Sequence, residues 1–187
     1  MIEIISGTNR PGCSTLKVAK VILGLYQSAG VEAQILNLQD LPPELFLPDA
    51  YANKPATFLP YQERVLQSEG LHVVIPEYNG SFPGVMKYFV DMLKFPESFE
   101  HRPVTYTGLG AGLWGNIRGV EQMQLVFNYR NAYNLPERTW LAGSGKKIKE
   151  DGSIDDPFFM ELLKGQVKQF ASFVERNKGT APHAIAK

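Results

Sequence analysis

The chain has 187 residues, of which 44% are hydrophobic and 20% are charged, and its formal net charge at pH 7 is zero. This length predicts one domain with a substantial core, and the balanced charge argues against nucleic acid or an acidic membrane surface as a partner. The one cysteine excludes an internal disulfide, and we see neither a signal-peptide pattern nor a membrane-spanning run, so we expect a cytoplasmic protein without membrane insertion.

Short apolar strands alternate with amphipathic helices along the chain. The first strand leads into a polar loop and a helix that we expect Ser14 or Thr15 to cap and Gly30 to end. The second strand alternates as an edge strand does, and five prolines between residues 42 and 60 make the next segment irregular. In chain order, we expect strands at 2–5, 31–38, 71–76, 104–108 and 139–141, and helices at 14–29, 61–68, 83–93, 116–133 and 157–176.

This alternation predicts βαβ units and therefore a parallel sheet that is covered on both faces. Five such units fit an α/β, doubly wound sheet with strand order 2-1-3-4-5, in which the first and third strands flank the ligand-binding switch point. We expect one domain at residues 1–178 and a mobile tail at 179–187. Residues 146–156 look like a charged excursion with an Asp-Gly turn.

The loop after the first strand, residues 6–15, has the residue types of a phosphate site. Ser6, Thr8, Ser14 and Thr15 supply hydroxyls, Arg10 supplies a guanidinium, and a helix follows whose amino terminus favours anions. The loop lacks the Gly-Lys-Ser/Thr sequence of a magnesium triphosphate site. The alternative is an ordinary polar loop with a serine cap, which is common.

The loop after the third strand is more distinctive. Residues 76–87 read Pro-Glu-Tyr-Asn-Gly-Ser-Phe-Pro-Gly-Val-Met-Lys and directly follow a β-branched run. The pattern predicts a buried strand that turns sharply outward, and Pro83 then sets φ at the start of a helix. A flat aromatic ring could be held here, and Tyr78 and Asn79 are best placed to shape its site. The alternative for Glu77 is a side chain that faces outward into solvent.

The glycines after the fourth strand satisfy the pattern Gly-x-Gly-x-x-Gly at 110–115. As a dinucleotide fingerprint the pattern fails, because it does not open a fresh βαβαβ half and no acidic residue ends the next strand. A third ligand loop around Gly108, Gly110 and Gly112 is the preferred interpretation. The alternative is that these glycines only turn the chain.

Together, the loops resemble those of the NAD(P)H-dependent FMN reductase family, whose fold is flavodoxin-like. The family's Gly-Ser-x-Arg-x-x-Ser loop is similar to residues 6–15, with an extra residue of spacing at 11–13. Its Pro-x-Tyr-Asn-Gly-Ser-x-Pro-Gly-x-x-Lys signature matches residues 76–87 at every defined position, and Gly-x-x-Arg-x-x-x-Gln matches residues 115–122. The third loop departs from the family's serine-containing versions.

The resemblance implies an enzyme that binds FMN and uses NADPH or NADH to reduce a small acceptor such as a quinone or free flavin. The flavin would carry out the difficult chemistry, so we name no catalytic residue, and the histidines lack metal-ligand spacing. Cys13 is better interpreted as a small, buried residue than as a redox group. The cofactor-binding set is Ser6, Thr8, Arg10, Ser14, Thr15, Pro76, Glu77, Tyr78, Asn79, Gly80, Ser81, Gly108, Gly110 and Gly112.

Two other functions stay open. An electron carrier of the flavodoxin type would be expected to have an acidic surface, which the neutral charge disfavours, and a dehydrogenase without flavin rests only on the glycine pattern at 110–115. The resemblance also implies a homodimer or homotetramer, paired through the third and fourth helices, in which the neighbouring subunit helps to wall the flavin. Those helices are rich in apolar residues, namely Val85, Tyr88, Phe89, Met92, Leu93, Ile117, Val120, Met123, Val126, Phe127 and Tyr129.

Overall fold

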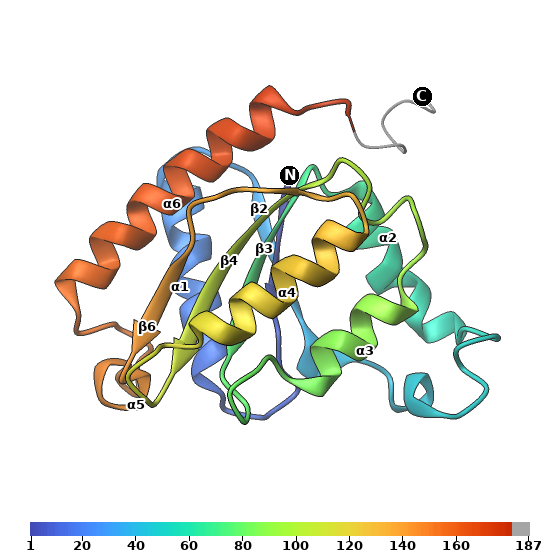
Figure 1. Cartoon of the computed structure of the whole chain (residues 1–187), viewed down its shortest axis with the longest axis horizontal. Helices are drawn as coiled ribbons and strands as arrows, with labels where there is room; N and C mark the ends of the chain where they lie inside the picture. Colours follow the sequence, from blue (N-terminus) through green and yellow to red (C-terminus); the bar gives the residue numbers. More distant parts are fainter. Residues whose placement is uncertain (181–187) are drawn as a thin grey trace.

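The computed structural model describes residues 1–180, so the tail expected at 179–187 lies outside the described residues apart from Gly179 and Thr180. A parallel sheet stands between two layers of helices (Figure 1). The strands are β1 (Ile2–Ser6), β2 (Ala33–Asn37), β3 (Gly70–Pro76), β4 (Pro103–Gly110), β5 (Tyr133–Asn134) and β6 (Thr139–Ala142). The helices are α1 (Ser14–Ser28), α2 (Leu59–Gln67), α3 (Gly84–Met92), α4 (Ile117–Tyr129), α5 (Ser144–Lys147) and α6 (Pro157–Arg176), with 3-10 turns η1 (Leu38–Asp40), η2 (Pro43–Phe46) and η3 (Ala56–Phe58).

The sheet has the order β2-β1-β3-β4-β5, which confirms the predicted order 2-1-3-4-5. The fifth position is divided between two strands, because β5 pairs with the first residues of β4 and β6 pairs with Thr107–Gly110. Pro136 lies in the break, where it has no N–H to donate to β4. The helix predicted to reach residue 133 was wrong at its end, since Tyr133 begins β5 and pairs with Pro103.

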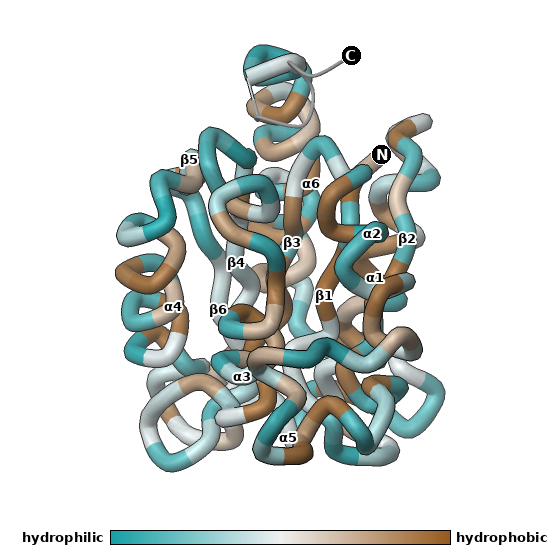
Figure 2. The backbone as a smooth tube through the Cα atoms, turned by 90° about the vertical axis from the view of Figure 1, so that its right-hand side faces the viewer, coloured by the Kyte–Doolittle hydropathy of each residue, from teal (hydrophilic) through white to brown (hydrophobic). Residues whose placement is uncertain are grey.

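Both faces of the sheet are buried, as expected for parallel strands with helices on either side. Alternate residues of β3 point to opposite layers: Val73 and Ile75 pack with α2, α3 and α4, whereas Val74 packs with α1 and α6. Figure 2 shows the hydrophobic stretches of β1 and β3 at the centre of the molecule. None of the helices among residues 1–180 is long and apolar enough to cross a bilayer.

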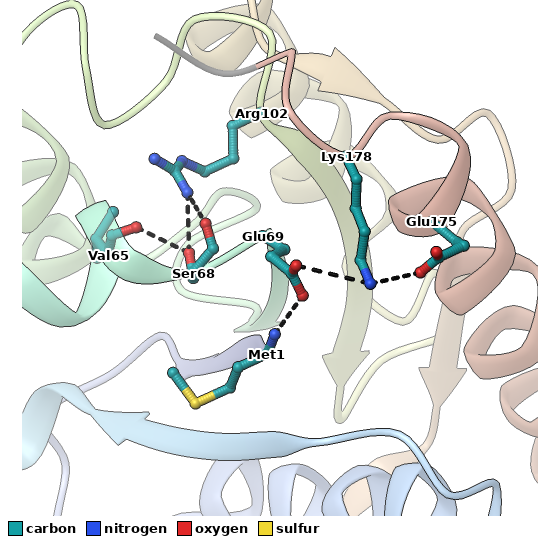
Figure 3. A network of polar contacts seen from close by, with 7 residues as sticks. All are labelled: Met1, Val65, Ser68, Glu69, Arg102, Glu175 and Lys178. Carbon is teal, nitrogen blue, oxygen red and sulfur yellow. Dashed lines mark hydrogen bonds and ion pairs between the residues drawn. The ribbon is translucent and has the colours of Figure 1, made fainter. Parts of the chain in front are cut away.

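A buried arginine joins the ends of several segments at the amino edge of the sheet (Figure 3). The guanidinium of Arg102, which is fully buried, donates to Ser68 Oγ at 3.2 Å, to the carbonyls of Ser98 at 2.8 Å and Glu97 at 3.0 Å, and to the Ser68 carbonyl. Burial lowers the pKa of Arg102 to about 10. Beside it, the amino group of Met1 pairs with Glu69. Polar contacts therefore connect the chain segments at this edge of the sheet, which lies opposite the loops that follow the strands.

A second buried polar network crosses the core beneath α6. His72 Nδ1 lies 2.9 Å from Tyr26 Oη, and His72 Nε2 lies 2.8 Å from Thr107 Oγ1. Thr107 and Thr139 both donate to Gln166 Oε1, at 2.9 and 2.7 Å. Because the one hydroxyl proton of Thr107 is used on Gln166, Thr107 must accept from His72 Nε2–H, and Nδ1 must accept from Tyr26. The network is complete only with a neutral His72.

Burial lowers the pKa of His72 to about 3, so we expect acid to destabilise the protein through this residue. Between that pKa and the ordinary value of about 6.5, the unfolded chain binds a proton that the folded chain does not, so the stability present above about pH 6.5 is lost as the pH falls toward 3. Urea unfolding should give a free energy about 2 kcal/mol lower at pH 5 than at pH 7 from this group.

The replacement His72→Gln should remove this part of the pH dependence. The control His101→Asn changes a histidine that stacks on Tyr133 outside this network, and it should leave the pH dependence in place. An unchanged difference between pH 5 and pH 7 in the His72→Gln protein would contradict the assignment.

Candidate functional site

Three loops meet at the carboxyl edge of the sheet, the lower edge in Figure 1. They follow β1, β3 and β4, and together with the start of α5 they line a pocket of about 270 Å³. Open α/β sheets bind ligands at this edge, beside the strands where the chain order reverses. The lining residues are Arg10, Pro11, Gly12, Cys13, Ser14, Thr15, Pro76, Glu77, Tyr78, Leu109, Gly110, Ala111, Ser144 and Gly145.

The first loop is fixed to the sheet at its beginning. Gly7 N donates to the carbonyl of Val74 at 2.9 Å, and a Cβ at Gly7 would lie 2.7 Å from that oxygen, so only glycine allows this approach. The next residue, Thr8, is fully buried, and its hydroxyl lies 2.9 Å from Tyr78 Oη and accepts from Arg10 N at 3.3 Å. The first and second loops are therefore joined by side-chain hydroxyls.

The amino terminus of α1 faces the pocket without a side-chain cap. The helix begins at Ser14 with Cys13 as its N-cap, so the expectation that Ser14 or Thr15 caps it was wrong; Cys13 makes no capping hydrogen bond. The amides of the first turn have no partner within the helix. The hydroxyls of Ser6 and Thr15 are buried and have no hydrogen-bond partner among residues 1–180. A bound phosphate fits this set, because it accepts hydrogen bonds from several donors at once.

The second loop contains a tight hairpin turn. Tyr78 N donates to Ser81 O at 2.9 Å, and Ser81 N donates to Tyr78 O at 3.1 Å. Asn79 and Gly80 have φ values of 51° and 74°, which are those of a type I′ turn and explain the Asn-Gly pair. The amides of Asn79 and Gly80 have no partner in the described part of the chain. The Ser81 hydroxyl donates to Gln122 on α4, which fixes the turn against that helix.

The third loop approaches the second through a glycine. A Cβ at Gly110 would lie 2.6 Å from Glu77 Oε2, so the carboxylate of Glu77 lies directly over the backbone of β4. Asn116, with φ of 69°, ends the loop and accepts from Gly119 N at 3.1 Å as the cap of α4. Its amide nitrogen donates to the Ile75 carbonyl at 3.0 Å, which holds the start of α4 against β3.

The structure brings half of the predicted site residues into the pocket lining and places the others around it. Ser6 and Thr8 are buried under the first loop, and the turn at Asn79, Gly80 and Ser81 stands beside the pocket. Gly112 lines a separate groove next to it. Gly108 and Gly110 are not in a loop: Gly110 is the last residue of β4, and Gly108 lies within that strand, where a Cβ would be 2.7 Å from Gly115 O. The predicted residues that line the pocket are Arg10, Ser14, Thr15, Pro76, Glu77, Tyr78 and Gly110.

Sequence reasoning missed three residues that build the site. Cys13 lines the pocket as the N-cap of α1, and it is a buried free thiol, in agreement with its interpretation as a small buried residue. Ser144 lines the far wall; the signal was the Gly-Ser pair directly after the last strand. Asn116 positions two loops, and the Gly-Asn pair before a helix was its signal. Residues 1–180 contain no group of three His, Cys, Asp or Glu side chains that could hold a metal ion.

Comparison with known proteins adds independent information. The family model described as NADPH-dependent FMN reductase matches residues 1–147. A quinone reductase of Pseudomonas putida is 26% identical over 186 residues, which cover 95% of this chain and 96% of that protein. An NAD(P)H-dependent FMN reductase of Pseudomonas aeruginosa is 26% identical over 180 residues, which cover 94% of this chain and 95% of that protein.

Solved structures share the fold. FerB, a flavoenzyme NAD(P)H:(acceptor) oxidoreductase from Paracoccus denitrificans, superposes with a TM-score of 0.77 at 23% identity and covers 94% of this chain and 97% of its own. An archaeal flavodoxin gives a TM-score of 0.64 at 13% identity, with coverage of 94% and 99%. Because the sequence identities are low, these structural similarities establish the flavodoxin-like fold alone.

Proposed function

The chain belongs to the NADPH-dependent FMN reductase family, and we propose that it transfers reducing equivalents from NAD(P)H through bound FMN to a small acceptor of the quinone class. It is an oxidoreductase, and FMN is its cofactor. The observation that carries the proposal is the pocket at the switch point, where an uncapped helix and the buried hydroxyl of Thr15, which has no partner among residues 1–180, fit a single phosphate. The quinone class rests on the relatives in P. putida and Escherichia coli that are named quinone reductases.

The three loops hold different parts of the cofactor. The phosphate belongs at the start of α1, where the first-turn amides, Ser14 and Thr15 donate and the guanidinium of Arg10 supplies charge. Arg10 is exposed and makes no side-chain hydrogen bond or ion pair within residues 1–180, so it is available. The ring belongs between the second and third loops, beside Tyr78 and Gly110. One phosphate-sized cradle favours FMN over FAD.

FMN, when bound, supplies the chemistry of accepting a hydride and passing electrons on. The chain itself has to bind and orient the ring, leave one face open and offer donors to its polar edge. The free amides of Asn79 and Gly80 are suited to that task because the type I′ turn fixes their direction before the ligand arrives. No protein acid or base is required, and we propose none.

The test is to identify the cofactor and then assay turnover. We expect a yellow protein that releases FMN in mass spectrometry and oxidises NADPH or NADH faster when a quinone is added. Release of FAD, or failure to take up any flavin after reconstitution, would refute the proposal. The second candidate is a flavodoxin-like electron carrier, which the shared fold allows; such a protein would hold FMN but would not oxidise reduced nicotinamide by itself.

We also propose that the protein self-associates through α3 and α4, although much of their apolar surface serves its own core. Phe89, Met92, Val120, Met123 and Phe127 are buried within the chain. What is left uncovered nearby is a smaller patch of three residues, Phe95, Leu125 and Tyr129, with exposed fractions of 54%, 69% and 78%. The guanidinium of Arg130 lies over the rings of Phe95 and Tyr129, at 4.1 and 5.3 Å from their centroids, so the patch contains one cation among its apolar side chains. Exposed apolar side chains on this face favour a two-fold contact between copies.

Light scattering at micromolar concentration should therefore give at least a dimer mass. The double replacement of Leu125 and Tyr129 by glutamate should shift the mass to a monomer, because it would bury two unpaired charges at the contact. Phe158→Glu changes an equally exposed apolar residue on α6 and should leave the mass unchanged. A monomeric wild-type protein would overturn this proposal.

A further inference from the structure

A second depression adjoins the cofactor pocket at the ends of β4 and β6. It is a groove of about 550 Å³ between the third loop and α5, and it shares Ala111 and Gly145 with the pocket. Gly143 N donates to the Gly112 carbonyl at 3.0 Å, and this hydrogen bond connects the two walls of the groove. Figure 1 shows α5 beside the ends of both strands. The groove is therefore a lateral extension of the site.

The groove has a mostly apolar lining and one available cation. Leu113, which is 88% exposed, forms its rim, and the other lining residues besides the lysines are alanine or glycine. Of its two lysines, Lys147 donates to Asp156 at 2.6 Å, so its charge is matched within the chain. Lys146 is exposed and has no side-chain hydrogen bond or ion pair among residues 1–180. An apolar groove with one unmatched positive charge suits a flat, apolar group that carries an anion.

We propose that this groove binds the adenosine end of NADPH and that Lys146 recognises its 2′-phosphate. The inference rests on the proposed function, because the nicotinamide must reach the flavin in the adjoining pocket while the remainder of the dinucleotide extends outward. The apolar rim at Leu113 suits the adenine face, and Lys146 supplies the point charge that a phosphate monoester needs. NADH has a hydroxyl in place of the 2′-phosphate and offers Lys146 no charge at that position, so this residue makes the protein select NADPH.

Two matched probes test the subsite without turnover. Titration calorimetry on the FMN-loaded protein should show tighter binding of 2′,5′-ADP than of 5′-AMP, which lacks the 2′-phosphate. In the Lys146→Glu protein the affinity for 2′,5′-ADP should fall by roughly tenfold or more, and the ratio of kcat/KM for NADPH to that for NADH should fall with it. Lys168→Glu makes the same charge change at an exposed residue of α6 and should alter neither quantity.

The outcomes separate this inference from the proposed function. Equal affinity of the wild-type protein for both probes, or a Lys146→Glu protein in which 2′,5′-ADP binds as before, would overturn the subsite even if FMN and NAD(P)H oxidation are confirmed. A protein that discriminates the probes through Lys146 but oxidises neither nucleotide would keep the subsite and refute the reductase.

Discussion

FMN binding should weaken by about 2 to 4 kcal/mol when Arg10 and Ser14 are both replaced by alanine. Charge-assisted hydrogen bonds to phosphate are the strong ones, and the two residues supply a cation and a hydroxyl at the start of α1, partly in parallel with the backbone amides. The loss corresponds to an affinity lower by roughly 30-fold to 1,000-fold. Fluorescence titration of FMN into flavin-free protein measures it, and an unchanged affinity would return the loop to an ordinary polar turn.

A single isosteric replacement sharpens this test. Thr15→Val removes a buried hydroxyl that has no partner among residues 1–180, so the free energy of unfolding without flavin should stay the same or rise. FMN affinity should nevertheless fall by roughly tenfold, because the hydroxyl gains its partner only from the ligand. Ser98→Ala is the matched control, since Ser98 Oγ is also buried and has no hydrogen-bond partner in the described part of the chain, but lies at the opposite edge of the sheet. It should not change FMN affinity.

The free energy of unfolding should fall by about 3 to 5 kcal/mol in the Arg102→Met protein. Methionine fills similar space but donates nothing, so the carbonyls of Ser68 and Ser98 lose their donor while they stay buried, and the partly buried carbonyl of Glu97 loses its donor as well. Urea unfolding at constant m-value measures the change. The effect should appear in stability and not in the FMN affinity of the folded protein, because Arg102 lies at the edge of the sheet away from the pocket.

Two further variants calibrate that result. Arg102→Lys keeps one charge but cannot serve several carbonyls at once, so its loss should be intermediate. Arg176→Met replaces an exposed arginine at the end of α6 and should cost less than about 1 kcal/mol. A loss below 1 kcal/mol in the Arg102→Met protein would show that water replaces the guanidinium at these carbonyls.

The parts of the fold that follow from local rules were predictable. Short apolar runs located most strands, their alternation with helices predicted a parallel sheet that fits the observed order, and the sequence at residues 76–80 predicted a sharp turn after the third strand. The two-residue strand β5 was not predictable, because it exists only through its pairing with Pro103 and Val104. Likewise, Gly108 cannot be distinguished from a loop glycine in sequence, since its role depends on how closely Gly115 approaches it.

In the site, too, some features could be predicted from the sequence and others could not. Residue types and a family signature located its loops, whereas the helix cap was misplaced because capping preferences favour Ser or Thr over Cys. An uncapped helix at Cys13 breaks a local rule, and such departures are expected where a ligand completes the structure. The absence of a side-chain cap is therefore better evidence for phosphate binding than the hydroxyls alone.

The contact between Gly7 and the Val74 carbonyl has a consequence for how this protein can diverge. The first loop is fixed at both ends: Gly7 is hydrogen-bonded to the sheet, and Thr15 is buried in the first turn of α1. Neither of these two anchors depends on the residues between them. Asn9, Arg10, Pro11 and Gly12 are exposed, and Gly12 has a φ of 63° that lets the chain reverse there. Insertions in this stretch leave both anchors in place but move Arg10, Pro11 and Gly12, which line the cofactor pocket. A library that varies the length of this loop while residues 7 and 15 are kept constant should therefore alter FMN binding more than the stability of the fold.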